Sequence, residues 1–138
     1  MNPLMSAFVK LNVRLYRWSG GRLMGRMGGA PILLLTTKGI KSGRLRTVPL
    51  LYIKDADSYV IVASFAGAPK DPAWYVNLVA NPTVQLQVGR EEFTASARCA
   101  SAEEKARLWP RLVAIYRPYE DYQKRTSRDI PLVILTRV

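Results

Sequence analysis

The chain has 138 residues, 49% of them hydrophobic and 22% charged, which is the size and composition of one globular domain rather than of a disordered segment. It contains no histidine and one cysteine, Cys99, so the commonest general base and metal ligand is missing and an internal disulfide is excluded. We therefore expect no metal site and a reducing compartment, while the net charge of +11 predicts an anionic partner.

That positive charge is concentrated near the start of the chain. Residues 1–54 hold ten Lys and Arg and no acid, and the remaining residues hold eleven against ten, so +10 lies before Asp55 and +1 from Asp55 onward. Nucleic acid, a membrane surface and an acidic ligand are all partners that such asymmetry favours.

Residues 4–18 predict an amphipathic helix, because apolar residues recur at the spacing of one helical face. These residues are Leu4, Phe8, Leu11, Leu15 and Trp18, and Lys10, Arg14 and Arg17 fall on an adjoining face. Two interpretations stay open: a helix packed on the core, and a basic interfacial helix on an anionic membrane surface. The glycine-rich residues 19–31 predict a linker, so we divide the chain into residues 1–30 and a domain of residues 31–138. No signal peptide or membrane-spanning segment is expected.

From Pro31 onward the pattern changes to strands. Residues 31–37, 48–54 and 59–65 predict three strands, and residues 83–88 and 92–98 predict a hairpin turning at Gly89-Arg90. Asp71 as N-cap and Pro72 as first residue predict a helix through residues 73–80. Ser101 and Glu104 predict a capping box for a helix reaching about Tyr116, and residues 130–138 predict a last strand. The order predicts an α+β domain on an antiparallel sheet, closed into a small barrel.

The stretch TTKGIKSGRLRTVPL, residues 36–50, combines glycines with Lys38, Lys41, Arg44 and Arg46. The P-loop spacing is absent and a strand follows, so that motif is rejected. A solvated basic hairpin and an anion site both fit, since glycines let backbone N–H groups approach a ligand. No pair of acids suits acid–base catalysis, and hydrolytic triads lack their histidine. If the protein is an enzyme, we expect an organic cofactor to supply the chemistry.

Two further stretches could line a pocket. Tyr116, Tyr119 and Tyr122 are spaced three apart around Pro118, which should disturb a helix there. Ser64 ends a predicted strand and precedes three small residues, where a ligand ring could approach. Ordinary packing explains each stretch equally well.

Taken in order, these segments resemble the deazaflavin-dependent nitroreductase and quinone reductase family. The resemblance is carried by LLLTTKGIKSGRLRTVPL, VIVASFAGAPKDPAWYVNLVANPTVQLQV, EEKARLWPRLVAIYRPYEDYQ and IPLVILTRV, which cover nearly all of the chain after residue 30. It implies a split β-barrel that binds coenzyme F420, a 5-deazaflavin with a phosphodiester and an oligoglutamate tail.

The resemblance also implies which residues hold the cofactor. The tail and phosphate would be held by Lys41, Ser42, Arg46 and Thr47, with Lys38 and Arg44 beside them and Val48 and Pro49 continuing the wall. The ring would contact Ala63, Ser64 and Phe65, and Trp74, Tyr75 and Asn77 would complete its pocket.

The implied reaction is hydride transfer from the reduced deazaflavin to a quinone, enone or nitroaromatic acceptor. Tyr119 would orient the acceptor, Tyr116 and Tyr122 would shape the pocket, and Ser64 would hydrogen-bond a cofactor or substrate oxygen. Some relatives have a tyrosine where this chain has Leu51, and Tyr52 points to the opposite strand face, so quinone reduction is favoured over nitro reduction. The expected location is the cytoplasm, with the inner face of the cell membrane as an alternative.

Three other interpretations stay open. The chain could be a non-catalytic F420 carrier, a flavin mononucleotide enzyme of similar shape or a basic nucleic-acid-binding module. No aromatic residue is interleaved with the cations of residues 31–50, so we expect no nucleic-acid partner.

Overall fold

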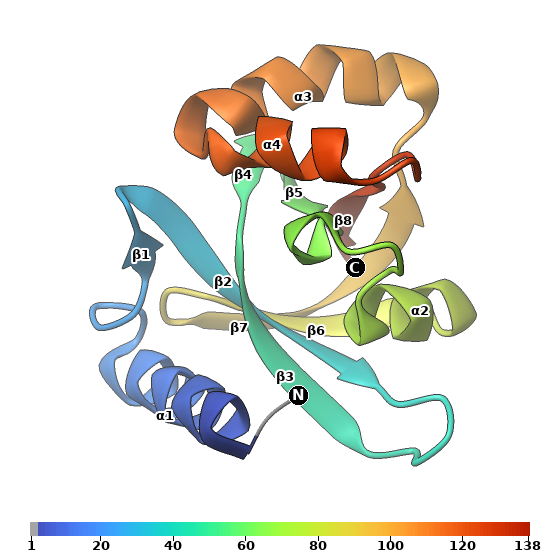
Figure 1. The fold of residues 1–138 in the computed structure, drawn as a ribbon. Coiled ribbons are helices and arrows are strands. Elements are labelled where there is room, and N and C mark those ends of the chain that lie inside the picture. Colours follow the sequence, from blue (N-terminus) through green and yellow to red (C-terminus); the bar gives the residue numbers. More distant parts are fainter. Residues whose placement is uncertain (1–2) are drawn as a thin grey trace.

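The computed structural model describes residues 3–138 of the chain (Figure 1). Its helices are α1 (Pro3–Ser19), a 3-10 turn η1 (Phe65–Gly67), α2 (Ala73–Ala80), α3 (Ala102–Ile115) and α4 (Pro118–Arg125). Its strands are β1 (Arg26–Met27), β2 (Ala30–Lys38), β3 (Leu45–Leu51), β4 (Ile53–Asp55), β5 (Ser58–Val62), β6 (Thr83–Val88), β7 (Glu91–Cys99) and β8 (Leu132–Arg137).

All strand pairs are antiparallel and belong to one curled sheet of eight strands. Seven strands follow the order β1-β2-β6-β7-β8-β5-β4, and β3 pairs with β2 outside this path. Figure 1 shows α3 and α4 together at the end of the sheet where β4 and β5 lie, with α1 next to β3, and α2 contacts β2 and β7. The predicted α+β class is therefore confirmed.

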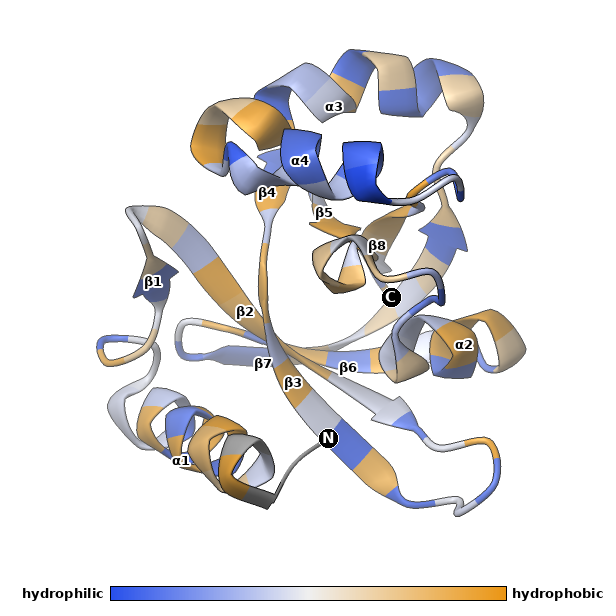
Figure 2. Cartoon of the chain, in the orientation of Figure 1, coloured by the Kyte–Doolittle hydropathy of each residue, from blue (hydrophilic) through white to orange (hydrophobic). Residues whose placement is uncertain are grey.

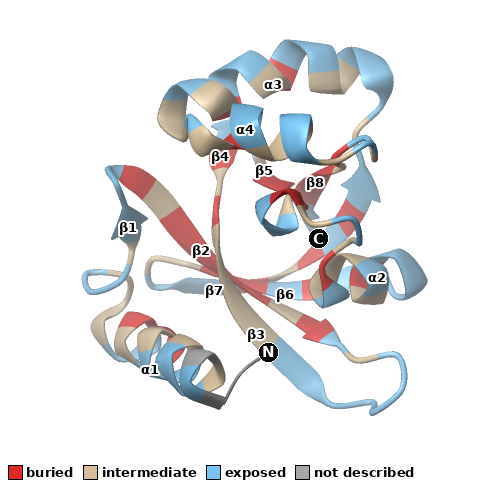
Figure 3. Ribbon diagram, in the orientation of Figure 1, coloured by how far each residue is buried: buried red, intermediate tan, exposed pale blue. Residues whose placement is uncertain are grey.

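Two hydrophobic clusters hold the helices on the sheet. Because side chains alternate along a strand, Ile32 and Leu34 of β2 enter one cluster, whereas Leu33 and Leu35 enter the other. The first cluster also contains residues of α1, α3 and α4, and the second contains Leu78 of α2. Figure 3 shows the result as buried residues concentrated in the middle of the sheet.

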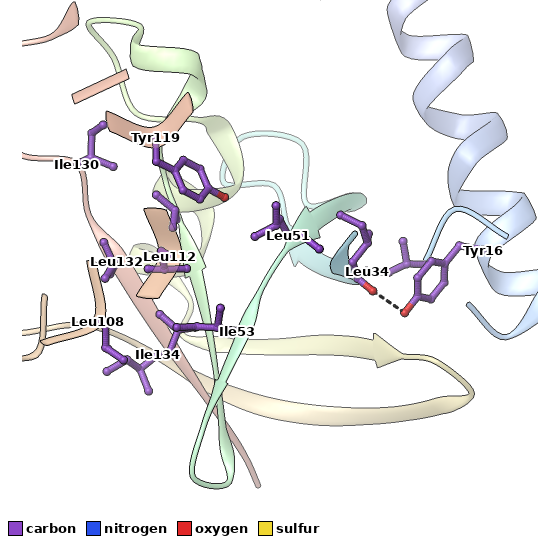
Figure 4. Packing of buried hydrophobic residues seen from close by; sticks show 14 of the residues in the cluster. Tyr16, Leu34, Leu51, Ile53, Leu108, Leu112, Tyr119, Ile130, Leu132 and Ile134 are labelled. Carbon is purple, nitrogen blue, oxygen red and sulfur yellow. Dashed lines mark hydrogen bonds between the residues drawn. The ribbon is translucent and has the colours of Figure 1, made fainter. Parts of the chain in front are cut away.

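Helix α1 has one face buried on the sheet and an apolar face exposed on the opposite side. Val13 and Tyr16 are buried against the sheet, and the Tyr16 hydroxyl donates to the Ile32 carbonyl at 2.9 Å (Figure 4). The same hydroxyl accepts from the Gly89 N–H at 2.8 Å. At 100° per residue, the predicted apolar face lies on the other side of the helix. Its residues Leu4, Phe8, Leu11 and Trp18 are 53–81% exposed, and Figure 2 shows the hydrophobic colouring of α1.

Several predicted boundaries differ from the observed ones. The strand predicted at residues 48–54 is two strands, and the first of them begins at Leu45. Pro49 is tolerated because β3 has no second partner strand among the described residues. Pro72, not Asp71, occupies the N-cap of α2, and it makes no side-chain cap. Asp71 instead pairs with Arg128.

Other local predictions are confirmed. Ser101 and Glu104 form the capping box, with the two hydrogen bonds at 3.2 and 2.9 Å. Pro118 does interrupt the helix: α3 ends at Ile115 and α4 begins at Pro118. Within the segment predicted as a linker, Arg26–Met27 forms the short strand β1. The division of the chain at residue 30 stays a prediction. No helix within residues 3–138 has both the length and the apolar character needed to cross a bilayer.

Candidate functional site

The loop between β2 and β3 is a tight, cation-rich turn. The Gly39 N–H donates to the Arg44 carbonyl at 2.8 Å, and the Gly43 N–H donates to the Gly39 carbonyl at 2.9 Å. Gly43 has φ +67°, which favours glycine, whereas a Cβ on Gly39 would lie 2.7 Å from the Ser42 hydroxyl and would force that side chain to move. The turn holds Lys41 exposed at its tip.

Cations around this loop have no acidic partner. Neither Lys38, Lys41, Arg44 nor Arg46 takes part in an ion pair within residues 3–138. Four cations without an acidic partner suit a polyanionic ligand rather than a single structural ion pair.

Arg46 and Thr47 of β3 point to opposite faces of the sheet. Arg46 is opposite Thr37 of β2, and the Thr37 hydroxyl accepts from the Asn77 amide of α2 at 3.2 Å. On the other face, the Thr47 and Thr36 hydroxyls are 2.7 Å apart, and Arg17 of α1 donates to Thr47 at 3.1 Å. Because the predicted cofactor residues are divided between two faces, one ligand can reach both sets only along the edge of β3.

That edge is available. Strand β3 pairs with β2 on one side, and no second partner is recorded within the described part of the chain. From Leu45 to Leu51 the strand spans roughly 20 Å, so it runs from the cationic loop to the cluster that contains Tyr119. Val48 and Pro49, the predicted wall, lie midway along it and are half-buried.

Arg128 fixes the segment that follows β5. Its guanidinium donates to the carbonyls of Ala63, Ser64 and Ala68 at 3.0, 2.6 and 2.9 Å, and it also contacts the Asp71 carboxylate at 3.1 Å. The Arg128 side chain is 15% exposed. These four bonds hold the ends of a short segment in a conformation that its own sequence does not favour.

The strain in that segment is visible in its backbone. Phe65, Ala66 and Gly67 all have positive φ, at +45°, +52° and +76°, and the first two carry side chains. Left-handed backbone in non-glycine residues is uncommon and concentrates at functional sites. A Cβ on Gly67 would lie 2.7 Å from the Tyr122 carbonyl, so this glycine lets the segment approach α4 closely.

The three tyrosines form one cluster next to this segment. The Tyr116 and Tyr122 hydroxyls are 3.2 Å apart, and the Tyr119 ring centroid is 4.9 and 6.2 Å from those of Tyr116 and Tyr122. Tyr119 is 6% exposed, and burial raises the pKa of its phenol well above the ordinary value. No protein group hydrogen-bonds its hydroxyl within residues 3–138, and this oxygen is not among the buried atoms that lack a partner, so it keeps contact with solvent. Figure 4 shows it directed to the side on which Leu51 lies. Tyr119 is therefore a neutral hydrogen-bond donor without a protein acceptor.

The predicted pocket residues of α2 lie apart from these tyrosines. Trp74 and Tyr75 pack on the second hydrophobic cluster, with their rings edge to face at 6.3 Å. The Tyr75 hydroxyl contacts the Cys99 sulfur at 3.0 Å, and burial raises the pKa of this phenol to about 12. Asn77 meets the hairpin through Thr37. Asn77 of α2 thus lies by the cationic hairpin on the β2 side, and the tyrosines share a cluster with Leu51 at the other end of β3.

Sequence reasoning missed Arg128, Arg17 and the threonine pair of β2. Arg128 binds backbone carbonyls about sixty residues away, for which no sequence spacing is diagnostic. Within the described residues, no group of three or more Cys, Asp and Glu could hold a metal ion.

Comparison with known proteins assigns the class. Solved structures at 10% identity, such as a pyridoxamine 5'-phosphate oxidase-type protein of Listeria innocua (TM-score 0.54, covering 96% of this chain and 93% of that one), share the fold alone. A structure of an F420-H2-dependent reductase is 44% identical, with a TM-score of 0.70, and the match covers 76% of this chain and 93% of that one. Another solved structure, described as a domain-swapped dimer, is 36% identical with a TM-score of 0.71 and covers 95% and 98%. The fold is thus the predicted split barrel.

Sequence similarity then gives the family. An F420H(2)-dependent quinone reductase of Mycobacterium tuberculosis is 44% identical over 134 residues, which cover 94% of this chain and 89% of the relative. The family model of F420H(2)-dependent quinone reductases matches residues 8–137. The chain therefore belongs to the F420H(2)-dependent quinone reductase family; it is an oxidoreductase whose cofactor is coenzyme F420. The carrier, nucleic-acid and flavin mononucleotide interpretations are set aside.

Replacing Arg128 should loosen the segment after β5. We expect Arg128→Met to lower the free energy of unfolding by about 2–3 kcal/mol, because it removes charged hydrogen bonds to largely buried carbonyls. Amide hydrogen exchange at residues 65–68 should increase more than in β7. The matched control is Arg117→Met, since the exposed side chain of Arg117 makes no hydrogen bond within residues 3–138. Equal stability and exchange in the two variants would contradict this role.

Proposed function

We propose that the chain binds reduced coenzyme F420 along the free edge of β3 and reduces a quinone at the tyrosine cluster. The observation that carries this proposal is the course of β3, which connects the unpaired cations of the hairpin to the unpartnered hydroxyl of Tyr119. An extended ligand with an acidic tail and an apolar ring matches these two ends.

At the cationic end, the residues suit the cofactor's phosphate and carboxylates. Lys41, Ser42 and Arg46 are exposed and can reach a ligand from one side of the strand. Thr47 presents its hydroxyl on the other side, where Arg17 and Thr36 fix it. Lys38 and Arg44 flank the loop and would contact a flexible tail.

At the other end, the residues suit the ring and an acceptor. When bound, the reduced cofactor supplies a hydride. Ala63, Ser64 and Phe65 would border the ring, held in place by Arg128. The Ser64 hydroxyl makes no hydrogen bond within the described chain, so it can donate to a cofactor or substrate oxygen.

Tyr119 would donate its hydrogen bond to a quinone carbonyl oxygen, which stabilises the negative charge that develops there. The phenol is protonated at neutral pH already at its ordinary pKa, and burial raises that pKa further, so it remains a donor at higher pH as well. Tyr116 and Tyr122 bond to each other and so present a fixed aromatic wall. Leu51 adds an apolar surface and no hydroxyl, which favours a quinone over a nitroaromatic acceptor; reduction of nitroaromatics stays a prediction.

Oxidation of reduced F420 by menaquinone, followed by the absorbance of the oxidised cofactor, tests the function directly. We expect protein-dependent oxidation with F420 and none with reduced flavin mononucleotide. Tyr119→Phe should lower kcat about ten- to a hundred-fold, since it removes one transition-state hydrogen bond, while F420 affinity changes little. Its matched control is Tyr59→Phe in the other cluster. A loss of F420 affinity with unchanged kcat would move Tyr119 out of the acceptor site.

The cationic end has its own test. We expect the double variant Lys41→Ala, Arg46→Ala to weaken F420 binding about tenfold or more, because charge-assisted hydrogen bonds to phosphate and carboxylate are lost. The salt dependence of binding should also decrease. Titration of F420 fluorescence measures both effects. The control variant Lys10→Ala, Arg14→Ala removes the same charge from α1. Equal weakening of F420 binding by both double variants would mean that only the net charge matters, and would contradict direct contact by Lys41 and Arg46.

We also propose that α1 lies on an anionic membrane surface, where a lipid quinone is available. Leu4, Phe8, Leu11 and Trp18 form an exposed apolar stripe, and Lys10 and Arg14 beside it are exposed as well. An apolar stripe flanked by cations is typical of interfacial helices. The opposite face of α1 is buried on the sheet, so such binding would leave the barrel intact.

A single charge on the stripe should reveal this contact. We expect Phe8→Glu to lower the bound fraction in sedimentation with anionic vesicles at least about threefold, because it buries a charge in place of an aromatic ring. Val79→Glu places the same charge on the exposed side of α2 as a control. Equal loss in both variants would contradict the proposal.

A further inference from the structure

A surface cavity lies where the end of α1 meets the turn between β6 and β7, and Arg17, one of its lining residues, also reaches Thr47 of β3. Its volume is about 300 Å³, at the lower end of the range for small-ligand sites. It is lined by Arg17, Trp18, Ser19, Gly20, Gln87, Arg90 and Glu92. Segments about seventy residues apart in the chain thus build one polar pocket.

Gln87, one of the lining residues, carries a buried acceptor without a partner. Its Oε1 is the only buried side-chain nitrogen or oxygen without a hydrogen-bond partner within the described residues, and Gln87 is 7% exposed. The other amide atom, Nε2, donates to the Gly89 carbonyl at 3.0 Å. This bond fixes the amide orientation, because the reverse orientation would place two acceptors together. A buried acceptor without a partner destabilises the folded chain, so Oε1 favours a donor from outside the chain.

Two guanidinium groups border the same cavity. Arg17 gives one hydrogen bond to Thr47 and keeps its remaining donors. Arg90 makes no ion pair or hydrogen bond within residues 3–138, and its stem lies against Gly20, where a Cβ would be 2.5 Å from Cγ of Arg90. Glu92, opposite Gln87 on β7, is also without a cation partner in this range. The pocket therefore has two guanidinium groups that could bind an anion and two hydrogen-bond acceptors, the Gln87 amide oxygen and the Glu92 carboxylate.

We propose that this pocket binds a phosphate ester that carries free hydroxyl groups, as in a glycerol-type phospholipid headgroup. Arg17 and Arg90 would hold the phosphate. One hydroxyl would donate to Oε1 of Gln87 and another to the Glu92 carboxylate. Inorganic phosphate would bind only to Arg17 and Arg90. An ester without a hydroxyl would leave Oε1 of Gln87 without a donor.

The position of Trp18 favours a lipid as the source. Trp18 lines the pocket, is 81% exposed and ends the apolar stripe of α1, so a headgroup in the pocket would have its acyl chains beside that stripe. Tryptophan is enriched where proteins meet the membrane interface. The lipid source rests on the proposed membrane contact of α1, whereas a free glycerol phosphate could bind without it.

Binding to matched ligands tests the proposal on the whole chain. Calorimetric titration with glycerophosphoglycerol and with inorganic phosphate measures the free ligands. Sedimentation with vesicles of phosphatidylglycerol or phosphatidylserine at equal mole fraction measures the lipids. We expect preference for phosphatidylglycerol, whose headgroup carries hydroxyls, and for glycerophosphoglycerol over phosphate. Glycerophosphoglycerol binding that survives Phe8→Glu would assign a free ester as a source, and binding to vesicles alone would assign the lipid.

Paired variants separate the pocket from general charge. Gln87→Met removes the acceptor and should weaken headgroup binding about tenfold, whereas Gln85→Met, on the exposed part of β6, should not. Arg90→Gln should weaken binding more than Arg14→Gln, which removes the same charge outside the pocket. Equal binding of the two lipids, or wild-type binding by Gln87→Met, would overturn the proposal and leave an internal water as the partner of Oε1. Oxidation of reduced F420 by a water-soluble quinone should be unchanged in every variant, so this failure is distinct from failure of the reductase function.

Discussion

The single pairing of β3 is the constraint on which the rest of the site depends. A strand paired on both sides would bury its backbone in the sheet, and its side chains would serve two separate faces. With one edge free, Arg46 on one face and Thr47 on the other can both border a ligand that lies along the edge. Pro49 fits the same arrangement, since an edge strand tolerates the missing N–H. In the proposed site, this free edge would make room for the cofactor that defines the family.

The second end of the site depends on a guanidinium that touches mainly backbone. The left-handed residues Phe65 and Ala66 would relax in an isolated peptide, and Arg128 holds both ends of their segment by bonds to Ala63, Ser64 and Ala68. Gly67 then permits the approach of α4, which carries Tyr119 and Tyr122. The strained backbone persists because the hydrogen bonds from Arg128 stabilise this conformation more than relaxation of the segment would.

Much of this architecture could be predicted because it is locally encoded. Alternating apolar residues predict β6 and β7, and the Ser101–Glu104 pair predicts the start of α3. The glycines of residues 36–50 predict the cationic turn. Arg128 and Arg17 could not be predicted, because their partners are distant in sequence and carry no distinctive side chain. The predicted N-cap of α2 was wrong for a related reason. Asp71 forms an ion pair with Arg128, and this tertiary contact replaces the local cap.

Helix α1 shows how two apolar patterns can share one segment. The stripe that dominates the sequence, from Leu4 to Trp18, is the exposed one, whereas the helix is held on the sheet by Val13 and Tyr16. The buried pair leaves the orientation of the helix fixed, and the orientation determines what the stripe faces. Because Tyr16 also binds the Gly89 N–H, the same contact places the end of α1 against the turn before Arg90. A membrane-facing stripe and a headgroup pocket would therefore be consequences of one docking interaction, and loss of Tyr16 would affect both together.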